Sequence, residues 1–144
     1  MRLETFEPYH IDLLKAQGVQ GAQLHEVSLV PASYARLLAP AGPCFTVFHG
    51  ERVTMCAGVA IAPGFSMGIV WAVISDSAAA HMLALHRGTL RFFETQRLRR
   101  LEATIEKGFK PGCRWAELLG FKYEGEMPGY GIDGQTHLRY GRVT

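Results

Sequence analysis

Five side chains that could accept or donate a proton lie beside expected turns or helix starts: Glu51, His49, His81, Tyr130 and His137. A carboxylate, imidazole or phenol in such a place can act as a general base or acid once it reaches a reacting group. The same residue types are also common at surfaces and in hydrogen bonds that only support a fold. Residue type therefore nominates Glu51, His81 and Tyr130 as weak catalytic candidates and leaves the catalytic residues unassigned.

A second group of residues could hold an anion. Ser75, Asp76 and Ser77 follow an apolar run and are all good N-caps for a helix. Backbone N–H groups at a helix N-terminus also bind phosphate, although the Asp76 carboxylate would compete for the same donors. Helix capping alone accounts for the three residues, and a modified phosphate-binding loop is the open alternative.

Positive charge is concentrated in one stretch that holds Arg87, Arg91, Arg97, Arg99 and Arg100. In the simpler interpretation these arginines form a solvated helix face, with the last turn complementing the helix dipole. In the other, Arg87 or Arg91 contacts phosphate groups, or the patch docks onto nucleic acid or another protein. Charge alone does not separate these interpretations.

Composition excludes several classes of protein. The 144 residues are 48% apolar and 19% charged, as in one globular domain covering residues 1–144. A net charge of +2 argues against a dedicated nucleic-acid binder. No signal peptide and no apolar run long enough to span a membrane are expected. Cys44, Cys56 and Cys113 are widely spaced and are read as buried thiols of a cytoplasmic protein.

Other familiar sites have no counterpart in the sequence. Nothing resembles a paired serine or cysteine nucleophile, a zinc spacing or a Walker loop, so no metal site is expected.

Hydrophobic periodicity predicts the elements that must position these side chains. Alternation predicts strands, and an apolar stripe with spacings of three and four predicts helices. The expected strands are 3–6, 44–49, 52–62, 68–75, 101–106, a strand from Phe121, and 136–142; the expected helices are 9–17, 32–38, one from Ser75 to about Arg99, and one ending at Gly120. The strands at 68–75 and 101–106 flank a helix, which favours a right-handed parallel pairing.

Residues 108–142 read as a short amphipathic helix, a glycine stop, a strand, a glycine-rich turn and a returning strand. Trp115, Ala116, Leu118 and Leu119 form the apolar stripe of the helix. Gly120 stands where the chain must leave the helix with positive φ.

This segment resembles the C-terminal part of the GCN5-related N-acetyltransferase (GNAT) superfamily. There, a helix ending in L-G-F leads into a strand that contains E-G and a turn that contains D-G. The residues in matching places are Arg114, Glu117, Leu119, Gly120, Phe121, Glu124, Gly125, Tyr130, Asp133, Gly134 and Tyr140. The resemblance covers about a quarter of the chain. It implies an α/β (α+β) fold with a mixed, mostly antiparallel sheet of about seven strands and four helices, in the order strand, helix, helix, three strands, helix, strand, helix, two strands.

The resemblance further implies acetyl-CoA as cofactor and a small-molecule or protein amine as acceptor. Backbone groups of Val73, Ile74 and Ser75, together with Arg87 and Gly88, are the implied cofactor-binding residues.

Two family features are missing from this sequence. The glycine pattern Q/R-x-x-G-x-G/A is absent, because its nearest approximation, at residues 87–90, places Leu90 where the second glycine belongs. Ala116 stands where the family usually has the tyrosine that protonates the departing thiolate.

A narrower resemblance concerns the N-terminus. Phe6, Glu7, Pro8, His10 and Asp12 are similar to the opening of GNAT-like proteins of tailed phages, which include a small internal virion protein of T7-like phages. This resemblance implies a fold without assured catalysis, virion protein partners and a place in the virion. Two functions therefore remain open: an acetyl-CoA-dependent N-acetyltransferase, and a catalytically inactive GNAT-fold interaction protein.

Overall fold

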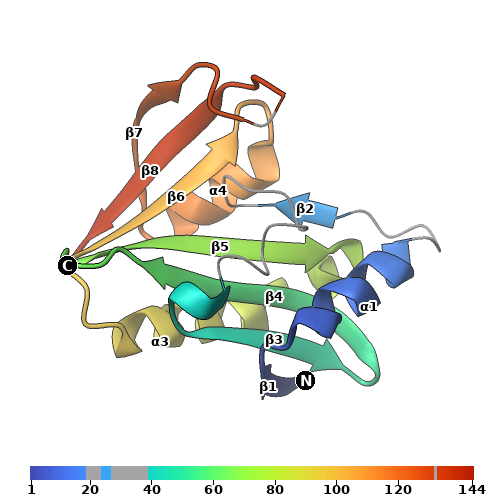
Figure 1. The fold of residues 1–144 in the computed structure, drawn as a ribbon. Helices are drawn as coiled ribbons and strands as arrows, with labels where there is room; N and C mark the ends of the chain where they lie inside the picture. Colours follow the sequence, from blue (N-terminus) through green and yellow to red (C-terminus); the bar gives the residue numbers. More distant parts are fainter. Residues whose placement is uncertain (19–23, 27–38, 132) are drawn as a thin grey trace.

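The computed structural model describes residues 1–18, 24–26, 39–131 and 133–144 (Figure 1). The strands are β1 (Arg2–Thr5), β2 (Leu24–Glu26), β3 (Cys44–His49), β4 (Arg52–Ile61), β5 (Met67–Ser75), β6 (Arg100–Glu106), β7 (Lys122–Met127) and β8 (His137–Val143). The α-helices are α1 (Pro8–Gly18), α3 (Met82–Thr95) and α4 (Lys110–Leu118), and the 3-10 helices are η2 (Ala39–Ala41) and η3 (Asp76–His81). Among these described residues, no helix is long and apolar enough to cross a bilayer.

All the strands belong to one mixed sheet. Seven of them follow the order β1-β3-β4-β5-β6-β8-β7, and β2 pairs separately with β5. Every pairing is antiparallel except that of β5 with β6. The predicted mixed sheet and the predicted parallel pair are both confirmed, and β2 is a strand that the sequence analysis did not expect.

The sheet carries an apolar core on each face. Trp71 and Val73 of β5 pack with Ile11 and Leu14 of α1. The alternate β5 residues, represented by Ala72, belong to the second core, which also holds Leu85, Phe93, Trp115 and Leu119 of α3 and α4. Because side chains alternate across a strand, β5 is buried on both sides. The prediction that Trp71 is a core residue is confirmed, since it is 2% exposed.

The sheet divides between β5 and β6. The two parallel strands pair only through Met67 with Arg100, Gly68 with Leu101 and Ile69 with Glu102. β5 then continues to Ser75 and β6 to Glu106 without further pairing between them, and the two strands diverge in Figure 1. We call this divergence the split.

β2 occupies one end of the split. Leu24 pairs with Ser75, His25 with Ile74 and Glu26 with Val73. The opposite edge of β5 is paired with β4 over Gly68–Ile74, so β2 must lie on the side that faces β6. Figure 1 shows β2 between β5 and α4.

The helices differ from prediction in two places. The helix expected from Ser75 to about Arg99 begins as the 3-10 helix η3, becomes α-helical only at Met82 and ends at Thr95. Ser75 precedes η3 but makes no side-chain capping hydrogen bond. Gln96 ends α3 because its backbone is extended, with ψ 122°. The helix expected at 32–38 lies outside the described residues.

Candidate active site

A groove of about 430 Å³ runs beside the split, and we call it the α4 groove. Its walls are the end of β5 (Ile74 and Ser75), η3 with the first residue of α3, and α4 with the turn before it. Ligand sites in proteins commonly have volumes of roughly 300–1,000 Å³. The α4 groove is therefore large enough for part of a small ligand or a cofactor arm.

The structure places the predicted cofactor residues of β5 on different surfaces. Ile74 and Ser75 line the α4 groove, whereas Val73 belongs to the core under α1. All three residues are paired with β2 along the edge that faces the split. Among the described strands, none pairs with residues 70–72 on that edge, because the β6 pairing ends at Ile69 and the β2 pairing begins at Val73.

Local sequence explains how α4 closes the other side of the groove. Proline in the first turn favours the helix start, and Gly120 has φ +92°, which confirms the predicted stop. At Gly112, a Cβ atom would lie 2.7 Å from the Phe109 ring and 3.1 Å from Ile105 Cγ2. Glycine therefore lets α4 approach β6 closely, and Trp115 of this helix is buried in the core.

A smaller apolar cavity of about 40 Å³ lies at the narrow end of the split, and we call it the apex cavity. It lies between Val70 and Ala72 of β5 and Ala103 and Ile105 of β6, just beyond the last β5–β6 pair. Gly112 and Trp115 line both the apex cavity and the α4 groove.

One buried hydrogen-bond donor of the residues around the apex cavity lacks an acceptor. The indole Nε1 of Trp115 is buried without a hydrogen-bond partner, and Trp115 lines the cavity. The Nε1 of Trp71 is also unpaired, but the Trp71 side chain packs in the core under α1, on the other face of the sheet. Buried polar groups in native structures are normally paired, so an unpaired donor at a cavity needs an explanation.

The predicted cationic residues lie elsewhere. Gly88 and Arg91 line a different groove of about 440 Å³ between α3, β1 and β3, which we call the α3 groove. Arg87 is an exposed residue of α3. The structure therefore separates Arg87 and Gly88 from Val73–Ser75, because η3 intervenes before α3 begins. Among the described residues that line the α4 groove, the charged one is Arg114.

The basic stretch is also divided between elements. Arg87 and Arg91 are in α3, whereas Arg100 belongs to β6 and forms ion pairs with Glu102 and Glu124. The last turn of α3 contains no basic residue, so the interpretation as one helix face with a dipole-complementing end is wrong.

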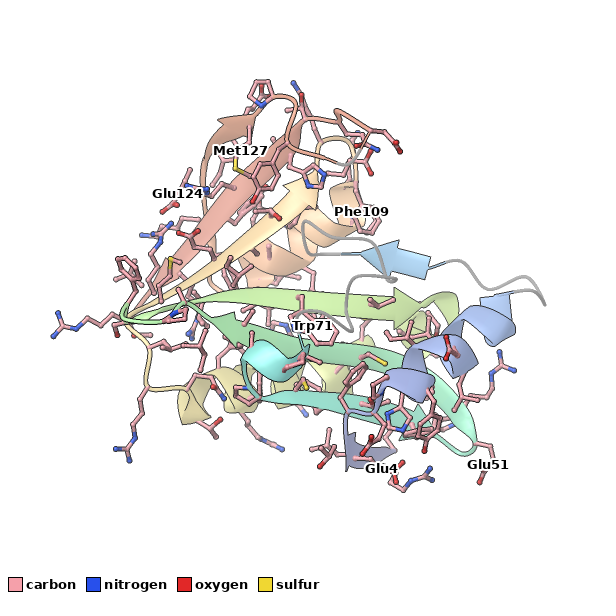
Figure 2. All side chains as sticks on the ribbon, in the orientation of Figure 1. Glu4, Glu51, Trp71, Phe109, Glu124 and Met127 are labelled. Carbon is pink, nitrogen blue, oxygen red and sulfur yellow. The ribbon has the colours of Figure 1, made fainter. Side chains whose placement is uncertain are left out.

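The candidate bases form two separate groups. His49 and His81 stack with ring centroids 4.3 Å apart, at the end of β3 and the end of η3. Glu51 follows in the β3–β4 turn, and Figure 2 shows it at the tip of this hairpin, far from Phe109 beside α4. Tyr130 and His137 lie together at the start of β8, with ring centroids 5.7 Å apart. His137 is adjacent to Glu106, the last residue of β6, at the wide end of the split.

A polar cluster on β6 and β8 escaped the sequence analysis. Thr104 is the register partner of Arg139, and His137 lies two residues before Arg139 on the same face of β8. Thr104 Oγ1, Arg139 Nε and His137 Nδ1 are buried without hydrogen-bond partners. Burial lowers the pKa of His137, so its imidazole is neutral at pH 7. Alternation with apolar residues made Thr104 and Arg139 resemble an ordinary solvent face, and only the strand register brings them together.

Comparisons with solved structures show that the fold is that of the GNAT acetyltransferases. A mutant of the spermidine N-acetyltransferase SpeG from Vibrio cholerae has a TM-score of 0.67 and 13% identity over 99% of this chain and 95% of that chain. RimJ from Mycobacterium smegmatis in complex with CoA-disulfide has a TM-score of 0.68 and 15% identity, over 99% of this chain and 81% of that chain. A ribosomal-protein-alanine N-acetyltransferase from Brucella melitensis has a TM-score of 0.69 and 14% identity, over the whole of both chains. No family model and no curated protein sequence matches the chain.

Proposed function

We propose that this chain binds acetyl-CoA in the α4 groove and transfers the acetyl group to an amine of a small molecule or a protein. The observation that carries the proposal is the split, which opens after three residue pairs directly beside a groove of about 430 Å³. The shared fold with N-acetyltransferases supports this function by analogy.

The residues of the groove fit the different parts of the cofactor. Met82, Phe109 and Trp115 offer an apolar surface to the pantetheine arm. Arg114 is the cation placed to contact phosphate oxygens. Residues 70–72 of β5 offer backbone groups on the edge that faces the split, so we place the arm there in preference to Val73–Ser75, which β2 pairs.

Acetyl-CoA supplies an activated acyl group: a C–N bond to the amine forms, the C–S bond breaks, and the amine loses a proton. His137 is the proposed base, because its imidazole is neutral and its buried Nδ1 has no partner. Tyr130 lies beside it and orients the ring. Ala116 has no proton donor, so the departing thiolate takes its proton from solvent in this scheme.

The alternative function is a GNAT-fold binding protein without acetyl transfer, such as a virion component. The pairing of β2 with Val73–Ser75 favours this alternative, because it occupies backbone groups that the family resemblance reserves for the cofactor. The missing glycine pattern and Ala116 point the same way.

Thermal denaturation with and without acetyl-CoA tests binding. A ligand at about one hundred times its Kd stabilises a protein by about 2.7 kcal/mol, which raises the Tm of a domain of this size by roughly 5–10 °C. Release of free CoA in the presence of a polyamine or of peptides with N-terminal alanine then tests transfer. Stabilisation without transfer supports the binding protein, and no stabilisation at millimolar acetyl-CoA contradicts the proposed function.

A further inference from the structure

The apex cavity lies where the acyl end of a bound thioester would arrive. Gly112 and Trp115 line both the α4 groove and the apex cavity, so the two spaces adjoin at α4. A cofactor arm that enters by the α4 groove and follows the split towards its narrow end therefore reaches the apex cavity with its reactive end. This placement rests on the proposed function.

The size of the apex cavity exceeds what an acetyl methyl group needs. Its volume is about 40 Å³, and a single water molecule needs roughly 10–15 Å³ by the same measure. The cavity thus has room for about three water-sized groups. Small residues create this room, since Ala72, Ala103 and Ala116 line the cavity and are all buried.

The lining favours hydrocarbon and one oxygen atom. Phe92, Phe93 and Phe121 contribute aromatic surface, and apolar cavities without polar partners stay dry. A methylene group placed there gains dispersion contacts that the empty cavity lacks. The polar exceptions include the unpaired indole N–H group of Trp115, which can only donate and therefore suits a carbonyl oxygen.

We propose that the apex cavity is an acyl pocket that selects a short acyl chain longer than acetyl, namely propionyl or butyryl thioesters of CoA. In the bound thioester, the chain beyond the carbonyl fills the cavity and the carbonyl oxygen accepts a hydrogen bond from Trp115 Nε1. The transfer step is balanced as for acetyl: the C–N bond forms, the C–S bond breaks, the amine loses a proton and the thiol gains one.

Isothermal titration of the full chain with CoA, acetyl-CoA, propionyl-CoA and butyryl-CoA tests this selection. One added methylene in an apolar pocket is worth about 10-fold or more in discrimination. We expect propionyl-CoA or butyryl-CoA to bind at least about 10-fold more tightly than acetyl-CoA. Equal binding of the three thioesters overturns the acyl pocket and leaves the proposed function standing. Failure of all four ligands to bind overturns both.

Filling the cavity provides the matched variant. Ala103→Val adds two methyl groups inside the apex cavity at a strand position that suits a β-branched residue. Ala60→Val is the control, because Ala60 is a similarly buried strand alanine that does not line the cavity. The preference for longer chains should disappear in Ala103→Val and persist in Ala60→Val. A preference that survives Ala103→Val overturns the proposal.

Trp115→Phe tests the hydrogen bond separately from the volume. We expect the affinity for all three thioesters to fall about 5- to 10-fold more than the affinity for CoA, because CoA has no thioester oxygen to accept the hydrogen bond. If Ala103→Val fails to fold, this variant together with the ranking of the thioesters by the native chain still decides the proposal.

Discussion

The two parts of the sheet on either side of the split differ in whether their buried polar atoms have hydrogen-bond partners. In the N-terminal part, β1, β3, β4 and β5, the buried His10 accepts a hydrogen bond from the Glu7 backbone and lies 2.8 Å from the Thr46 hydroxyl. In the C-terminal part, β6, β8, β7 and α4, buried atoms of Thr104, His137, Arg139 and Trp115 have no hydrogen-bond partner, although Arg139 Nε lies 3.9 Å from a carboxylate oxygen of Glu102. Among the described residues, the one further buried side-chain atom without a hydrogen-bond partner is Nε1 of Trp71, a residue of β5 next to the split.

Under the proposed function, this difference separates the part that supports the fold from the part that binds the ligand. A satisfied buried network stabilises one conformation, whereas an unpaired buried donor or acceptor costs about 1–3 kcal/mol until something pairs with it. In the proposed function, the N-terminal part acts as a scaffold, and the C-terminal part provides the groups that a cofactor and an acceptor would engage. Each of the following experiments compares one residue from each groove or from each part of the sheet.

Blocking the two grooves gives the largest expected difference. Ala79 and Ala84 are both exposed alanines, and they line the α4 groove and the α3 groove respectively. Ala79→Trp should abolish the stabilisation by acetyl-CoA, a loss of about 2.7 kcal/mol at one hundred times the Kd of the native chain, because the indole fills the groove. Ala84→Trp should retain it. Thermal denaturation measures both, and the reverse result would move the site to the α3 groove.

Removing one arginine from each groove should have a smaller effect. Arg114→Ala should weaken acetyl-CoA binding by about 10-fold, because it removes a charge-assisted contact to phosphate. Arg91→Ala, in the α3 groove, should leave the Kd unchanged. Titration calorimetry at low and high salt measures both variants, and an equal loss in the two would argue for a nonspecific charge effect.

Acid should act mainly on the scaffold. Burial lowers the pKa of both His10 and His137. Each histidine is neutral in both the folded and the unfolded chain above about pH 6.5. The unfolded chain gains protons first as the pH falls below that value, so stability is lost from about pH 6.5 down to the folded pKa. Protonating His10 Nδ1 also breaks its 3.0 Å bond from the Glu7 N–H, whereas His137 Nδ1 has no bond to lose.

We therefore expect His10→Asn to remove more of the acid-induced loss than His137→Asn, by on the order of 1 kcal/mol between pH 7 and pH 5. Urea denaturation at several pH values measures the loss. The asparagine amide oxygen keeps an acceptor and does not titrate. If the two variants flatten the curve equally, the hydrogen bond of His10 contributes nothing beyond burial.

Exposed ion pairs should give the smallest difference. Glu124 pairs with Arg100 in the C-terminal part, and Glu4 pairs with Arg2 at 3.4 Å in the N-terminal part. Glu124→Gln should lower the free energy of unfolding by less than about 1 kcal/mol. Glu4→Gln should leave it nearly unchanged. We expect the larger effect at Glu124 because its partner Arg100 is held in place by a second hydrogen bond, 2.8 Å long, to Glu102. Unfolding free energies in 0.1 M and 0.5 M salt measure both, and the cost of Glu124→Gln should shrink at high salt.

Most of the fold was predictable because it is encoded by local patterns. Alternation located β3 and β4, and the continuous apolar run located β5 as a strand buried on both faces. Gly120 marked the end of α4, since positive φ favours glycine. β2 was missed because a strand of three residues is too short to show alternation.

The candidate site was only partly predictable, because it depends on where strands stop pairing. Ile74 and Ser75 were nominated through the family resemblance, at the end of an apolar strand, and they line the α4 groove. Arg87 and Gly88 were nominated for a helix start that lies elsewhere, since cap residues do not reveal that six residues of η3 come first. The apex cavity depends on the register that ends at Ile69 and Glu102, which leaves no pattern in the sequence.

The three-residue pairing of β2 with β5 has a consequence for assembly. Release of this short strand would present the backbone donors and acceptors of Val73–Ser75 to solvent in the middle of a wide sheet. An exposed edge of this kind is a template for a strand from another polypeptide. By pairing with Val73–Ser75, β2 covers a strand edge that could otherwise pair with a strand of another polypeptide.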